Sequence, residues 1–324
     1  MERALVTGSS GLVGYRVAER LHEAGVDVLG VDLQATEGPF PSVGGNAADL
    51  PLMRRLVEGR PNVVHSGAVS GPMLMLDNPY DIAQANLGGA MGMFEACRQA
   101  GVRRLVWLSS IAVYGDQPTL EPILETAAVN PQSFYGHTKA AGEILLHAYV
   151  ARYGLPALAL RLSSVFGLRR RTEYGLRQVI EAGLAGRPVT VAAEGSSFRQ
   201  YLHVDDAAEA VLLALAAPDP RQLIYNVTGG TYVTEAELAA MLQDMLPGLI
   251  TVPGSPAWNE GHLGPLVIDA AQRDLAYQPQ IHLRDGLLEL AMEMRRKALM
   301  PATMSPTGLG SVSKRGRFPG KNVI

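Results

Sequence analysis

The chain has 324 residues, of which 47% are hydrophobic and 18% charged, as in a folded globular protein. Its net charge of −3 argues against a nucleic-acid partner, and its one cysteine excludes a disulfide framework. The apolar run 211–217 stops at Pro218, well short of the roughly 20 residues of a membrane span. The N-terminus lacks the apolar stretch of a signal peptide. We therefore expect a cytoplasmic protein that does not enter a membrane.

The first 165 residues alternate short apolar runs with amphipathic stretches, which is typical of βαβ units around a parallel sheet. Near-continuous apolar runs predict buried strands at 4–8, 26–32, 62–68, 103–110 and 155–167. Helices are predicted at 12–24, 80–99 and 135–153. This order predicts an α/β fold with a doubly wound parallel sheet.

After Gly167 the alternation loosens. A further strand is expected at 223–230, and helices at 174–184, 207–217, 234–246 and 283–297. Thr234 and Glu237 have the spacing of a capping box at the start of a helix. We expect this half to form a smaller lobe whose loops recognise a substrate.

Three glycines lie between the first predicted strand and the first predicted helix: Gly8, Gly11 and Gly14. They permit a tight turn and bring the backbone close to a pyrophosphate, which a helix N-terminus stabilises. The turn holds one residue more than G-x-G-x-x-G, and alone it fits an ordinary glycine-rich turn equally well. Asp32, at the end of the second strand, favours a dinucleotide-binding turn over an ordinary glycine-rich turn. A carboxylate there accepts hydrogen bonds from the adenosine ribose and repels a 2′-phosphate, which selects NAD over NADP.

A tyrosine and a lysine four residues apart, Tyr135 and Lys139, share one face of a predicted helix. A lysine ammonium beside a phenol lowers the phenol pKa from about 10 toward neutrality. Tyr135 can then act as a general base for a substrate hydroxyl, and Ser110 can position the same oxygen. Such spacing is common on exposed helices, so the prediction depends on its combination with the upstream glycine turn.

Several motifs occur in one order along the chain: TGSSGLVG, VVHSGA, LSSIAVYGD, YGHTK, RLSSVFG, RQYLHVDDAA and YNVTGG. With them the chain resembles the extended short-chain dehydrogenase/reductase superfamily, also called the NAD-dependent epimerase/dehydratase family, over about residues 1–300. The resemblance implies that Tyr135 is the acid/base and that Lys139 also binds the nicotinamide ribose. It implies that Ser110 holds the reacting oxygen and that Asn86 supports Lys139 through a proton relay. Hydride would pass between a substrate carbon and NAD.

The resemblance and the glycine turn together give a set of candidate NAD-binding residues. They are Gly8, Ser10, Gly11, Leu12, Val13, Gly14, Asp32, Leu33, Asp49, Leu50, Ser66, Gly67, Ala68, Ser109, Tyr135 and Lys139. The candidate substrate-binding residues are Ser70, Gly71, Ser110, Ile111, Ser164, Arg170 and Arg199. The seven histidines lack metal-ligand spacing, so no metal is predicted.

Two departures from the family narrow the reaction and the substrate. Family dehydratases and decarboxylases carry an acid directly after the catalytic Ser/Thr, whereas this chain has Ile111 and Ala112, so oxidation, reduction and epimerisation remain. Ser164 stands where many nucleotide-sugar enzymes have Asn. Conversely, Arg199 and the three arginines at 169–171 could bind an anionic substrate group. The alternative explanation of the three arginines is a solvent-exposed loop.

We therefore predict an NAD-dependent dehydrogenase of carbohydrate metabolism that acts on a small polyhydroxylated substrate: a sugar, a sugar acid or a hydroxy acid. The alternative is a nucleotide-sugar epimerase with tightly bound NAD. A further alternative is a non-catalytic NAD-binding regulator, against which the joint presence of Ser110, Tyr135 and Lys139 argues.

The domain prediction follows from these motifs. Residues 1–167 are expected to form an NAD-binding Rossmann domain to which 201–228 return. Residues 168–200 and 229–300 are expected to form the substrate-binding lobe. Residues 301–324 lack periodicity and hold basic but no acidic side chains, which predicts a flexible basic tail.

Two predicted helical stretches, 82–94 and 140–150, are apolar around most of their circumference. A helix of this kind is buried on both sides. One side would cover the sheet and the other a second subunit. The resemblance implies the same homodimer, built on a four-helix bundle.

Overall fold

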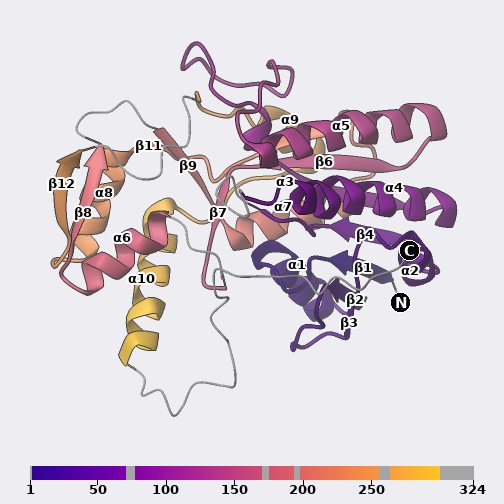
Figure 1. The fold of residues 1–324 in the computed structure, drawn as a ribbon, viewed down its shortest axis with the longest axis horizontal. Coiled ribbons are helices and arrows are strands. Elements are labelled where there is room, and N and C mark those ends of the chain that lie inside the picture. Colours follow the sequence, from indigo (N-terminus) through magenta and orange to yellow (C-terminus); the bar gives the residue numbers. More distant parts are fainter. Residues whose placement is uncertain (1, 71–76, 170–174, 193–197, 255–262, 300–324) are drawn as a thin grey trace.

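The computed structural model describes residues 2–70, 77–169, 175–192, 198–254 and 263–299, and its main layer is a seven-stranded parallel sheet (Figure 1). In spatial order the strands are β10 (Ile224–Val227), β6 (Ala157–Leu162), β5 (Arg104–Ser110), β4 (Asn62–His65), β1 (Arg3–Thr7), β2 (Asp27–Asp32) and β3 (Ser42–Gly44). Every neighbouring pair runs parallel. The chain winds outward from β1 to β3 and then crosses to β4 on the other side. This confirms the predicted doubly wound α/β fold.

Helices cover both faces of this sheet, as the two hydrophobic cores show. On one face lie α1 (Leu12–Glu23), α7 (Val204–Ala216) and α9 (Asp269–Leu275). On the other lie α2 (Leu50–Val57), α3 (Pro79–Ala83), the π-helical segment η1 (Gln84–Gly88), α4 (Gly89–Ala100) and α5 (Phe134–Tyr153). All residues of β4 and β6 are buried. Burial on both faces explains why these strands are almost continuously apolar.

The strand predicted at 155–167 is divided in the structure. β6 stays in the main sheet, whereas β7 (Ser164–Phe166) pairs with β9 (Phe198–His203) in a separate sheet. Between them, the amide of Ser163 donates to the carbonyl of Val227, 3.0 Å away. A continuous apolar run therefore spans two sheets, because both parts are buried and no polar residue type marks the change.

The helix predicted at 80–99 is also interrupted, since α3 and α4 are joined by η1. A π-helical turn inserts one extra residue and changes the direction of the side chains. The short elements β3, α2 and α9 were not predicted. Each is too short to show a clear hydrophobic period.

The remaining elements form the smaller lobe at the left of Figure 1. It contains a three-stranded sheet in the order β11 (Tyr232–Thr234), β9 and β7, and the pair β12 (Ile250–Gly254) and β8 (Pro188–Ala192). Its helices are α6 (Gly175–Leu184), α8 (Glu235–Met245) and α10 (Leu283–Leu299). The capping box predicted at Thr234 and Glu237 is present at the start of α8. A third hydrophobic core joins α6, α8 and α10.

Within residues 201–228, α7 packs against α1 and β10 joins the main sheet, whereas the end of β9 belongs to the three-stranded sheet. The domain boundaries stay a prediction. Among the described helices, none combines the length and the apolar character needed to cross a bilayer. The predicted tail at 301–324 lies outside the described residues.

Candidate active site

The glycine turn lies at the carboxyl end of β1 and packs tightly against the loop that follows β4. Gly8 has a φ of +72°, and a Cβ there would lie 2.6 Å from the amide nitrogen of Gly67. A Cβ on Gly14 would lie 2.2 Å from the carbonyl oxygen of Gly8 and 2.4 Å from Oγ of Ser66. Only glycine fits these positions. The start of α1 is thereby left open for an anionic group to approach its backbone amides.

Asp32 stands at the end of β2, beside this turn. Its carboxylate accepts hydrogen bonds from the backbone amides of Ser10 (2.9 Å) and Leu33 (2.7 Å). The Ser10 hydroxyl in turn bonds to that of Thr36. Each carboxylate oxygen retains acceptor capacity, so the group is held in place and can still accept from ribose hydroxyls.

Other candidate NAD-binding residues lie on the loops around the same sheet edge. Ser66 donates its hydroxyl to the carbonyl of Thr7, 2.7 Å away, which holds the loop carrying Gly67 and Ala68 close to β1. Asp49 is exposed and caps α2 by accepting from the amide of Leu52, at 3.0 Å. An adenine contact from Asp49 or Leu50 stays a prediction.

The residues present fit NAD: the glycine turn has no room for a side chain, and Asp32 would accept hydrogen bonds from the ribose. The remaining candidates in this set are Leu12 and Val13, on the first turn of α1.

Tyr135 and Lys139 occupy the first turns of α5, which begins after Ser133, whose hydroxyl accepts from the amide of Gly136. The Lys139 ammonium lies 5.8 Å from the centre of the Tyr135 ring. It donates to the carbonyl of Leu108, 2.7 Å away on β5. The predicted pairing of these two residues on one helix face is present in the structure.

Lys139 is buried, and burial lowers the pKa of its ammonium to about 8, an effect that the carboxylate of Glu143 opposes. Because the pKa stays above 7, Lys139 is mostly protonated at neutral pH. A protonated Lys139 would stabilise a phenolate at Tyr135, as the predicted base role requires.

Ser110 ends β5 at the same sheet edge. Its hydroxyl accepts from the amide of Ala112 (3.2 Å) and caps the 3₁₀ turn η2 (Ile111–Val113). A Cβ on Gly136 would lie 2.5 Å from the carbonyl oxygen of Ala112, so the start of α5 is packed directly on this turn. The turn that follows Ser110 therefore contacts the start of the helix that carries Tyr135.

Asn86 lies in η1, and its amide is fully engaged. It donates to the carbonyl of Val69 (3.1 Å) and to the hydroxyl of Thr138 (3.0 Å), and it accepts from the amide of Val69 (2.7 Å). Thr138 donates onward to the carbonyl of Tyr135. These contacts tie the helix of Tyr135 to the loop at Val69. A proton relay from Asn86 to Lys139 stays a prediction.

The hydroxyl of Ser109 donates to Oε1 of Glu143, 2.6 Å away in the interior. A contact of Ser109 with NAD stays a prediction. Neighbouring side chains on a strand point to opposite faces of the sheet, so the hydroxyl of Ser110 does not point toward Glu143.

A buried polar network below the site was not predicted. Arg161 on β6 forms two hydrogen bonds with Glu143 and also donates to the hydroxyl of Tyr114 (2.8 Å), which bonds to Asn226. The one available signal was the arginine inside the apolar strand ALALRL, because a buried charge needs a partner.

Arg199, a candidate anion ligand, is buried on β9 and forms an ion pair with Glu235, 2.5 Å away and equally buried. The sequence pattern did not reveal this partner. Beside the pair, Phe198 stacks on Tyr232 with the ring centres 4.5 Å apart. The charge of Arg199 is therefore balanced by a carboxylate within the lobe.

The other substrate candidates are scattered. Ser70 is exposed, Ile111 is partly buried against the Tyr114 cluster, and Ser164 lies on β7. The guanidinium of Arg169 stacks on Tyr15 of α1, 3.5 Å from the ring centre. Gly71, Arg170 and Arg171 lie outside the described residues.

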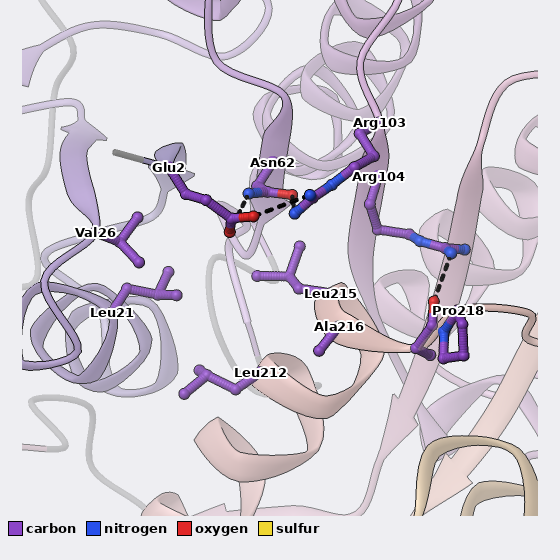
Figure 2. Close-up of a pocket in the computed structure, with 11 residues that line it drawn as sticks. Glu2, Leu21, Val26, Asn62, Arg103, Arg104, Leu212, Leu215, Ala216 and Pro218 are labelled. Atoms are coloured by element: carbon purple, nitrogen blue, oxygen red, sulfur yellow. Dashed lines mark hydrogen bonds and ion pairs between the residues drawn. The ribbon is translucent and has the colours of Figure 1, made fainter.

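A cavity of about 470 Å³ lies at the opposite, amino end of the main sheet (Figure 2). Arg103 there bonds to the side chains of Glu2 and Asn62, both at 2.9 Å, and Arg104 donates to the carbonyl of Ala217. Its polar groups thus bond to one another, far along the strands from the catalytic residues. It is not the candidate active site.

Among the described residues, no group of three or more His, Cys, Asp and Glu is placed to hold a metal ion. His65 is buried beside Thr7, and burial lowers its pKa to about 3. It is therefore neutral at physiological pH. The absence of a metal stays a prediction.

Comparison with known proteins defines the class. The model of the NAD dependent epimerase/dehydratase family matches residues 4–228. The chain belongs to this family, and it is an NAD-dependent enzyme of the extended short-chain dehydrogenase/reductase type.

Among curated proteins, the UDP-glucose 4-epimerase of Mycolicibacterium smegmatis is 32% identical over 317 residues, which cover 91% of this chain and 99% of the relative. Among solved structures, the UDP-glucose 4-epimerase of Thermotoga maritima with UDP-glucose has a TM-score of 0.82 at 26% identity, covering 92% of this chain and 100% of that one. The Thermus thermophilus UDP-glucose 4-epimerase in complex with NAD has a TM-score of 0.79 at 28% identity, with the same coverage. These relatives favour the epimerase alternative over the dehydrogenase that we first predicted.

Proposed function

We propose that this enzyme is a 4-epimerase of a nucleotide-sugar, with Tyr135 as its acid/base. The observation that carries the proposal is the nearly full-length similarity to UDP-glucose 4-epimerases. The placement of Tyr135, Lys139 and Ser110 at the edge of an NAD-binding sheet supports it. Ile111 and Ala112 carry no acid, so water elimination has no proton donor at these two positions.

Bound NAD supplies the hydride acceptor at the start of the reaction and the hydride donor at its end. Tyr135 takes the proton from the sugar hydroxyl while Ser110 orients that oxygen. Lys139 stabilises the phenolate form of Tyr135, which is present before the proton is taken and again after it is returned. The 4-keto sugar then rotates so that its other face meets the nicotinamide, and Tyr135 returns the proton to the C4 oxygen. The sugar is therefore neither oxidised nor reduced overall.

Purified enzyme incubated with UDP-glucose or UDP-glucuronate tests the proposal. We expect the 4-epimer to appear by proton NMR without net formation of NADH. Stoichiometric NADH from a free sugar or sugar acid, with no epimer, would contradict it.

The Arg199–Glu235 pair favours a second candidate function, a dehydrogenase for a small sugar or sugar acid without a nucleotide. A buried carboxylate on Arg199 offsets the positive charge that a diphosphate would use. The same substrate panel separates this candidate from the epimerase.

We also propose that the enzyme acts as a homodimer, that residues 168–200 and 229–300 recognise the substrate, and that the protein is cytoplasmic. Exposed apolar side chains on α3 and α5 support the dimer, among them Tyr80 and Ile144.

A further inference from the structure

Lys139 is a buried cation whose direct hydrogen bond goes to a neutral group, the carbonyl of Leu108. The nearest carboxylate along its own helix is Glu143, one turn further on and also buried. An ammonium in this position depends on a nearby negative charge to remain protonated.

Glu143 is held rigidly by three hydrogen bonds. Arg161 donates Nε to Oε1 (2.9 Å) and Nη2 to Oε2 (2.7 Å), and Ser109 donates its hydroxyl to Oε1 (2.6 Å). A two-point guanidinium–carboxylate contact fixes orientation as well as distance.

Arg161 is held in turn by groups that come from a different part of the chain. Its Nη1 donates to the hydroxyl of Tyr114 (2.8 Å) and to the carbonyl of Glu125 (3.0 Å). Tyr114 donates to Asn226 on β10, 2.6 Å away. Neither member of the ion pair can turn away from its position without breaking several bonds.

We propose that Glu143 is a positioning residue for the reaction, which keeps Lys139 protonated in its buried place, and that Arg161 limits how much of the Glu143 charge reaches Lys139. This inference rests on the proposed roles of Tyr135 and Lys139. It adds two buried residues to the site, Glu143 on α5 and Arg161 on β6, behind those that would contact the substrate.

The groups that face Lys139 act in different directions. On its own helix are Tyr135, whose phenolate it would stabilise, and Glu143, which favours the ammonium. His65 on β4 is neutral because burial lowers its pKa to about 3. Arg161 on β6 forms an ion pair with Glu143 at 2.7 Å, so its positive charge partly offsets the charge of Glu143.

Two single substitutions should therefore move the pH profile in opposite directions. Glu143→Gln removes the negative charge, lowers the pKa of Lys139 below about 8 and makes activity fall at a lower pH. Arg161→Gln leaves Glu143 uncompensated, raises that pKa and extends activity to higher pH. We expect shifts of about one pH unit each.

The readouts are the pH profile of kcat and the ultraviolet phenolate absorbance of Tyr135, taken as the difference from Tyr135→Phe. Glu143→Asp keeps the charge and should restore most of the wild-type profile. Glu143→Gln leaves a buried arginine without its carboxylate partner and can unfold the protein. The double variant Glu143→Gln/Arg161→Gln is therefore compared with the single variant Arg161→Gln. This comparison measures the effect of the Glu143 charge in proteins that both lack Arg161.

The inference is overturned if these variants lose stability while the alkaline limb of the kcat profile and the phenolate titration of Tyr135 stay where they are in the unchanged protein. The Glu143–Arg161 pair would then have a structural role only. If Tyr135→Phe retains wild-type turnover, the proposed function fails instead. The two failures are thus distinguished by separate variants.

Discussion

Tyr135 is the residue on which the proposed chemistry depends most directly. Replacing it with Phe keeps the ring beside Lys139 and removes the hydroxyl that moves the proton. General acid–base catalysis contributes about 10²–10⁴-fold to a rate, so we expect a loss of turnover in that range. NAD binding, measured by calorimetry, should be unchanged within a few-fold. Full turnover by this variant would contradict the assignment.

Glu235 allows a test of how the substrate anion is bound. We expect Glu235→Gln to lower stability and to tighten the binding of a UDP-sugar several-fold, because the charge of Arg199 is no longer balanced. Glu237→Gln is the matched control, because Glu237 lies on the same turn of α8 and bonds to Thr234 in the capping box. Unchanged affinity for UDP and UDP-sugars in calorimetry would show that Arg199 does not contact the diphosphate, and would favour the dehydrogenase candidate.

At the scale of elements, Gly142 allows α5 to pack directly against β5. A Cβ on Gly142 would lie 2.5 Å from Cη2 of Trp107, a fully buried ring on β5. We expect Gly142→Ala to destabilise the protein by about 1–3 kcal/mol through overpacking, despite the better helix propensity of alanine. Chemical denaturation measures the effect.

Gly89 on α4 is the control, because a Cβ there meets ordinary contacts at 3.5 Å or more. Gly89→Ala should be neutral or stabilise by up to about 1 kcal/mol. Equal effects of the two substitutions would show that the packing of α5 on Trp107 is not tight.

The same elements show what sequence can predict. Strands such as β4 and β6 were found because burial on both faces requires apolar residues throughout. The division between β6 and β7 was not found, since both parts are buried alike. Tyr135 and Lys139 share one helix, so their spacing revealed them. The Glu143–Arg161 and Arg199–Glu235 pairs each join two different elements, and only tertiary structure brings such partners together.

At the scale of the whole molecule, the helix layer formed by α3, α4 and α5 presents apolar side chains outward. Ile144 on α5 is 73% exposed and Tyr80 on α3 is 70% exposed. Large exposed apolar side chains that share a surface mark a site of association. We therefore expect a homodimer through this layer in light scattering coupled to size exclusion.

Ile144→Glu should convert this dimer to a monomer, because a symmetric interface brings two copies of the substituted helix together and so buries the new charge twice. Met292→Glu on α10, at a residue 64% exposed on the smaller lobe, is the control and should leave the mass unchanged. If both variants and the unchanged protein have the same mass, α5 does not form the subunit contact. A monomer that retains turnover would further show that the catalytic edge of the sheet is complete within one chain.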